Sequence, residues 1–132
     1  MLIITSFFAS LLSAFYIKLA FNVISLRREN KISLGNGGSN DLEKAIRAHG
    51  NFSEYVPIGL ILMGCLELNG APWWLITFFG ITLSAGRIFH ATGIQEVGPK
   101  FDNRIRGMKF TFNTLIALIA LNLGWSLYRL FF

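Results

Sequence analysis

Apolar residues fall into four long segments separated by short polar connections. The segments span residues 2–26, 44–68, 73–93 and 107–129. Each is long enough for a helix that crosses about 30 Å of hydrocarbon, which takes about 20 residues. The pattern predicts an all-α membrane protein that consists of one four-helix transmembrane domain. Because the connections are short, consecutive helices are expected to run antiparallel.

Local signals suggest where two of these helices begin. Asn40 and Glu43 have the spacing of the N-cap and N3 positions in a capping box, so the second helix is expected to start at about Asp41. An Asn-Gly-Ala-Pro turn at 69–72 ends that helix. Pro72 suits the first turn of the third helix, because a helix leaves its first N–H groups unpaired in any case.

Composition supports the membrane interpretation. Of the 132 residues, 53% are hydrophobic and 14% are charged, whereas soluble domains carry about 25% charged residues. The net charge is +5, but no run of like charges marks a nucleic-acid-binding arm. The single Cys65 excludes an intramolecular disulfide, and no spacing of His, Cys and carboxylates indicates a metal site. We therefore expect membrane lipids as partners, with neither nucleic acid nor a metal.

The basic residues predict an orientation. Nine of the 12 Lys and Arg residues lie in or beside the loops 27–43 and 94–106, while the connection 69–72 has none. The positive-inside rule then places both loops in the cytoplasm and both termini on the opposite side of the membrane. For Arg28, Lys31 and Lys109, ordinary topology and lipid anchoring explain the charge.

A polar stripe in the second segment carries the most specific chemistry. Arg47, Asn51, Glu54 and Tyr55 lie three and four residues apart, so they share one face of a helix. A carboxylate at that depth costs a few kcal/mol unless it is paired, and an arginine on another helix is a suitable partner.

The third segment supplies Arg87, with His90 one turn later on the same face. Several guanidinium groups together with one carboxylate suit a small ligand that has more than one carboxylate and a free amine; a phosphate would be held by similar groups. The alternative is that these residues only hold the helices together.

These motifs resemble the MAPEG family, the membrane-associated proteins in eicosanoid and glutathione metabolism. The second-helix pattern Arg47-Ala-x-x-Asn51-x-x-Glu54-Tyr55-x-Pro57 carries the resemblance most specifically. Supporting matches are the end of the first helix at 23–28, Arg87-x-x-His90 and Ile105-Arg106. The chain looks most like the small bacterial members, which implies a bacterial inner membrane protein that assembles as a homotrimer.

The resemblance also implies a function and the residues that perform it. A family member of this kind is a glutathione-dependent transferase or peroxidase, with glutathione as cosubstrate and a lipophilic electrophile that enters from the bilayer. Arg106 matches the arginine proposed to activate the thiol, and Arg104 is a possible substitute. The positions that match glutathione contacts are Arg27, Arg47, His49, Asn51, Glu54, Tyr55, Arg87 and His90.

One departure from the family leaves the activity open. Ile94 stands one turn after His90, where several family enzymes have a tyrosine. A non-catalytic glutathione- or lipid-binding scaffold of the same fold is therefore the alternative to an enzyme. A small multidrug exporter fits less well, because its proton-coupled carboxylate is expected in the first helix, which has no acid before Glu29.

Overall fold

The computed structural model describes residues 1–95 and 102–131. Over these ranges the chain forms four helices and no strand. The helices are α1 (Ile3–Asn30), α2 (Asn40–Leu68), α3 (Trp73–Gln95) and α4 (Asp102–Phe131). The predicted all-α fold with four helices is confirmed.

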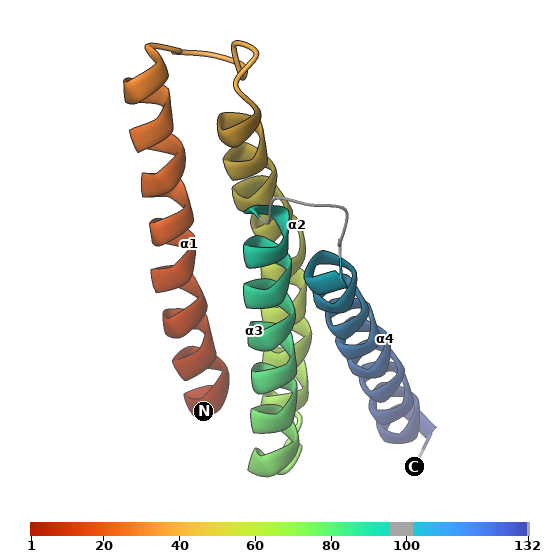
Figure 1. Ribbon diagram of the computed structural model, residues 1–132. Coiled ribbons are helices and arrows are strands. Elements are labelled where there is room, and N and C mark those ends of the chain that lie inside the picture. Colours follow the sequence, from red (N-terminus) through yellow and green to blue (C-terminus); the bar gives the residue numbers. More distant parts are fainter. Residues whose placement is uncertain (96–101, 132) are drawn as a thin grey trace.

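The helices form an antiparallel bundle (Figure 1). α2 and α3 lie in the middle, with α1 and α4 on opposite sides of them. Both termini lie at one end, which we call the terminal end. The α1–α2 loop, the C-terminus of α3 and the N-terminus of α4 lie at the other, the loop end. The α1–α2 loop and the described residues on both sides of the second loop, which are predicted to share one side of the membrane, are therefore at the same end of the bundle.

The outer surface of the bundle is apolar. Within the described residues, α1, α3 and α4 are long and apolar enough to cross a membrane. Large apolar side chains such as Phe7, Phe21 and Ile116 are more than half exposed on the outside of α1 and α4. The core between the helices contains Phe8, Leu12, Phe52, Met63, Leu83 and Leu118. α2 is not among the three apolar helices, and its first half carries the predicted polar stripe.

Glycine allows α3 and α4 to cross closely near the loop end. A Cβ added to Gly107 of α4 would lie 2.4 Å from the backbone nitrogen of His90 and 2.6 Å from the carbonyl oxygen of Gly86. These are backbone atoms, which cannot rotate away as a side chain can. Small residues at such crossings are typical of helix packing in membranes, where backbones approach each other to gain packing contacts. The crossing fixes the start of α4 beside the last turns of α3.

The predicted capping box is wrong by one residue. Ser39, with an extended backbone, is the N-cap of α2, and its hydroxyl accepts a hydrogen bond from the backbone N–H of Leu42 at 3.4 Å. Asn40 is already helical, and the Glu43 carboxylate accepts instead from the Asn36 side chain at 2.9 Å. Serine and asparagine are both favourable N-caps, so composition did not distinguish the neighbouring positions.

The loops are shorter than the sequence pattern predicted. α1 continues through Arg27 and Arg28 to Asn30, and α4 begins at Asp102 rather than at residue 107. The end of α1 is closed by Lys31 in the left-handed conformation, with backbone bonds to the carbonyls of Arg27 and Arg28. The apolar pattern marks the part of a helix that suits lipid, while polar turns extend the helix beyond it.

At the terminal end, Glu67 of α2 caps α1. Its carboxylate oxygens accept hydrogen bonds from the backbone N–H groups of Ile4 at 2.9 Å and Thr5 at 2.8 Å. The N-cap residue of α1 itself, Leu2, makes no side-chain cap. A carboxylate suits this position because the N-terminus of a helix has unpaired donors and a partial positive charge. Glu67 therefore ties α1 to α2.

Candidate functional site

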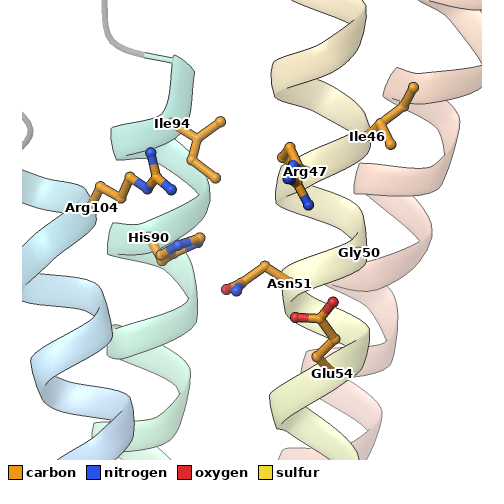
Figure 2. Close-up of a pocket in the computed structure, with 8 residues that line it drawn as sticks. All are labelled: Ile46, Arg47, Gly50, Asn51, Glu54, His90, Ile94 and Arg104. Atoms are coloured by element: carbon orange, nitrogen blue, oxygen red, sulfur yellow. The ribbon is translucent and has the colours of Figure 1, made fainter. Parts of the chain in front are cut away.

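A polar cavity of about 320 Å³ lies near the loop end, between α2, α3 and α4. Figure 2 shows Arg47, Asn51 and Glu54 of α2 on one side of it and His90, Ile94 and Arg104 of α3 and α4 on the other. It is lined by Ile46, Arg47, Gly50, Asn51, Glu54, His90, Ile94 and Arg104. The structure thus brings together several residues predicted to form one site, from three helices.

The charged groups of this cavity are available to a ligand. Arg47 and Glu54 are both exposed and separated by about two turns of α2. Across residues 1–95 and 102–131, no hydrogen bond or ion pair engages the Glu54 carboxylate. The partner that was expected on another helix is therefore not bonded to it within one chain. Arg104 of α4 lines the opposite wall, so a second guanidinium faces the same space.

Arg87 has a different environment from the cavity arginines, because its side chain is only 1% exposed. Its Nη1 donates to the side-chain oxygen of Asn51 at 2.7 Å and to the Asn51 carbonyl at 3.3 Å. Its Nε and Nη2 donate to the Thr111 hydroxyl at 3.0 and 2.6 Å. Nη2 also approaches the Met108 sulfur at 3.5 Å. Arg87 therefore connects α3 to α2 and α4 in the interior.

Two other predicted residues adjoin these groups. His90 is 3% exposed and lines the cavity. Tyr55 is half-buried; its ring packs under the Arg87 guanidinium at 5.2 Å and edge-on against Phe112 at 5.5 Å. Tyr55 does not line the cavity, but it supports the guanidinium beside it.

His49 and Arg27 lie apart from the cavity in a single chain. The His49 ring stacks on Tyr16 of α1 at 4.5 Å, on another face of α2. Arg27 Nη1 donates to the carbonyls of Ser33 at 3.3 Å and Gly35 at 3.0 Å, so it braces the α1–α2 loop. Neither residue contributes to the cavity lining.

The two candidate thiol-activating arginines are placed differently. Arg104 lines the cavity, whereas Arg106 is exposed and lies outside the lining set. Arg104 also borders an apolar groove of about 400 Å³ on α4, formed with Ile105, Met108, Lys109 and Phe112. Arg104 therefore stands between a polar cavity and an apolar surface.

Sequence reasoning missed Thr111 and Met108, which hold Arg87. Thr111 is four residues after Gly107, and its hydroxyl donates to the Gly107 carbonyl at 2.8 Å. That donation leaves the oxygen lone pairs to accept from Arg87. A small residue one turn before a threonine was the only signal in the sequence, and it is common in membrane helices.

The cavity offers two guanidinium groups, a carboxylate, an amide and an imidazole. Such a set has the chemistry to hold a small zwitterion with more than one carboxylate. Among residues 1–95 and 102–131 there is no group of three or more His, Cys, Asp or Glu that could hold a metal ion.

Comparison with known proteins identifies the family. The MAPEG family model matches residues 5–124. The inner membrane protein YecN of Escherichia coli strain K12 is 36% identical over 129 residues, covering 98% of this chain and 97% of the relative. YecN of Escherichia coli O6:H1 matches equally well. No solved structure matches the chain. With its apolar helices and these relatives, the chain is a membrane protein that belongs to the MAPEG family.

Proposed function

We propose that this protein is a glutathione-dependent transferase or peroxidase that acts on lipophilic electrophiles in the membrane. The observation that carries the proposal is the polar cavity, in which Arg47 and Arg104 accompany a Glu54 that has no bonded partner among the described residues. The cavity volume, about 320 Å³, falls within the range of small-molecule sites.

Glutathione matches the cavity group by group. It has two carboxylates, one ammonium group and a thiol. Glu54 is the natural acceptor for the ammonium group, and Arg47 suits a carboxylate because a guanidinium group binds it through paired hydrogen bonds. Arg104, on the opposite wall, is then left for the thiol. His90 and Asn51 complete the polar lining. The other predicted contacts, Arg27, His49, Tyr55 and Arg87, act as supports or belong to a site that a neighbouring copy shares.

The chemistry follows from a guanidinium beside the thiol. A nearby positive charge favours the thiolate, which is the nucleophilic form. The sulfur then forms a bond to the electrophilic carbon of the substrate as the leaving group departs with the bonding electrons. With a hydroperoxide, two glutathione molecules are oxidised to the disulfide while the O–O bond is reduced to alcohol and water. Arg104 is the better placed guanidinium within one chain; Arg106 can serve only from a neighbouring copy.

The adjoining apolar groove supports a lipophilic second substrate. Ile105, Met108 and Phe112 form its apolar wall, and Arg104 separates it from the polar cavity. A substrate dissolved in the bilayer can reach this groove without crossing water. The electrophile and the thiol then meet at Arg104.

We further propose a homotrimer in a bacterial inner membrane, with the loop end in the cytoplasm. The nine basic residues in or beside loops 27–43 and 94–106 support this orientation. The exposed Glu54 supports an assembly, because a neighbouring copy would shield a carboxylate that is otherwise open at the side of α2. Mass measurement of the detergent-solubilised protein tests the number of copies.

Calorimetric titration of the folded protein with glutathione in detergent tests the proposed function. Heat of binding is expected at or below millimolar glutathione, and S-methylglutathione serves as the control that keeps every charged group but has no free thiol. A folded protein that binds neither compound would contradict the proposal. Turnover is then measured with a halogenated aromatic electrophile and with an organic hydroperoxide.

Ile94 favours one alternative, a binding scaffold without catalysis. It lines the cavity at the position where family enzymes have a tyrosine, so no phenol is present there to assist the reaction. Glutathione binding without turnover of either substrate would establish this alternative. Turnover in the Ile94→Tyr variant but not in the original protein would show which group is missing.

A further inference from the structure

The bonding of Arg87 uses every donor that a guanidinium has. An arginine side chain carries five N–H groups and no acceptor. Two of the five point to Asn51, two to the Thr111 hydroxyl and one to the Met108 sulfur. No N–H group remains for a ligand, and the side chain is 1% exposed. Arg87 therefore acts on the cavity through its neighbours.

Asn51 is the neighbour through which Arg87 reaches the cavity. An asparagine amide has one oxygen, which accepts, and one NH2 group, which donates. The reverse orientation would set NH2 against the guanidinium, donor against donor, so Arg87 fixes the oxygen inward. Asn51 lines the cavity, and its tip points across it in Figure 2. The end left for a ligand is the NH2 group.

We propose that Arg87 is a positioning residue that makes Asn51 a hydrogen-bond donor toward the cavity. The ligand group that Asn51 recognises is then an oxygen acceptor, a carboxylate or an amide carbonyl, and not an ammonium group. This assignment rests on the proposed function for the identity of the ligand, but the Arg87–Asn51 link does not depend on it. It changes the role of Arg87 from ligand contact to support.

The surroundings of Arg87 strengthen the same assignment. No carboxylate bonds the guanidinium within the described ranges, so its positive charge is buried there without a bonded counter-ion. Its supports are neutral: the Asn51 amide, the Thr111 hydroxyl and the face of the Tyr55 ring. A buried cation that lacks a counter-ion favours an anion nearby. The charge and the orientation of Asn51 thus both select an anionic oxygen in the cavity.

Asn51→Asp is the most informative variant, because the two side chains have the same shape. The new carboxylate would pair with Arg87 and compensate the buried charge, so the melting temperature is expected to rise. The variant replaces the NH2 donor by an acceptor, so glutathione affinity is expected to fall roughly tenfold or more. The melting temperature would then rise while the glutathione affinity falls. If Asn51 had only a structural role, a more stable variant would not bind glutathione more weakly.

Two substitutions of Arg87 complete the experiment. Arg87→Leu removes the charge and the donors. In that background Asn51→Asp is expected to lower the melting temperature, whereas it raises it when Arg87 is present. Arg87→Lys keeps a cationic donor and is expected to restore part of the affinity lost in Arg87→Leu. If Arg87→Leu fails to fold, Asn51→Asp still decides the matter, because the proposal requires a higher melting temperature together with a lower glutathione affinity.

Calorimetry with glutathione and thermal unfolding without ligand are measured on each variant. Unchanged glutathione affinity in Asn51→Asp, or the same stability change for Asn51→Asp with and without Arg87, would overturn the positioning role. If the original protein does not bind glutathione, the proposed function fails. The unfolding cycle without ligand still reports whether Arg87 and Asn51 are linked, so the two failures are distinguishable.

Discussion

Two glutamates of α2, Glu54 toward the loop end and Glu67 at the terminal end, have carboxylates in opposite environments. At the terminal end, Glu67 accepts two backbone N–H groups of α1, at 2.9 and 2.8 Å. At the loop end, Glu54 is exposed and lines a cavity opposite Arg104 without bonding to it. The Glu67 carboxylate is hydrogen-bonded within the chain. The Glu54 carboxylate has no bonded partner in the described part of the chain, so it is free to bind a ligand.

The difference distinguishes two kinds of polar side chain in a membrane helix, those that stabilise the fold and those that are available to a ligand. A polar group whose donors or acceptors are all used inside the chain holds helices together, as Glu67 and Arg87 do. A charged group that lines a cavity and lacks a partner is a cost that a ligand can offset. By this criterion we assign Glu54, Arg47 and Arg104, which line the cavity, to the proposed ligand site.

The largest effect is expected where α3 and α4 cross. Gly107→Ala would set a Cβ against backbone atoms of His90 and Gly86, so α4 must move away from α3. We expect a loss of about 3 kcal/mol of stability, at the upper end for overpacking, because backbone cannot rearrange as a side chain can. Arg104 and Thr111 move with α4, so the proposed glutathione binding is expected to be lost as well.

Gly124→Ala is the matched control on the same helix, toward the terminal end. A Cβ at Gly124 meets no atom within 4 Å, so the variant is expected to gain up to about 1 kcal/mol from helix propensity. Unfolding of both variants by denaturant in mixed micelles provides the comparison. Equal effects of the two substitutions would show that the crossing does not fix the loop end.

An intermediate effect is expected from exchanging each glutamate for glutamine. Glu54→Gln removes the charge that faces a ligand ammonium group, which is worth about 1.5–3 kcal/mol of binding, or roughly tenfold to a hundredfold in affinity. Its melting temperature should change little. Glu67→Gln keeps one acceptor but loses the charge at the start of α1, so we expect about 1 kcal/mol of lost stability and unchanged affinity.

Calorimetry and thermal unfolding of these two variants test the comparison directly. Loss of affinity in Glu67→Gln equal to that in Glu54→Gln would mean that the two ends are not functionally distinct.

An effect on binding smaller than that of Glu54→Gln is expected at the thiol. Arg104→Ala should raise the pKa of bound glutathione by about one unit, which corresponds to ~1.4 kcal/mol. The ultraviolet absorbance of the bound thiolate then falls at neutral pH. Arg106→Ala should leave it unchanged, because Arg106 lies outside the cavity lining of its own chain. The opposite result would place Arg106 of a neighbouring copy beside the thiol.

The sequence predicts the helices better than their ends. Apolar length identifies four helices, and charge identifies the polar stripe of α2. The sequence does not reveal that α1 continues to Asn30 or that Ser39 caps α2, because a polar segment is compatible with both a helix end and a loop.

The sequence predicts the site only in part, because spacing along one helix does not determine the contacts between helices. Spacing along α2 places Arg47, Asn51 and Glu54 on one face, and the cavity contains all three. That spacing cannot show that the donors of Arg87 are used by Thr111 and Asn51, since those bonds depend on how closely α3 and α4 cross. Nor does it show that His49 turns toward Tyr16. Contacts between helices require the packing of the whole bundle.

An experimental structure of the protein with glutathione tests the central claim most directly. We predict tripeptide density in the cavity at the loop end, with its ammonium group at Glu54, a carboxylate at Arg47 and the sulfur beside Arg104. The Asn51 NH2 group should face an oxygen of the ligand, while Arg87 keeps its bonds to Thr111. A cavity without the tripeptide at saturating glutathione, or density that avoids Glu54, would contradict the proposed site.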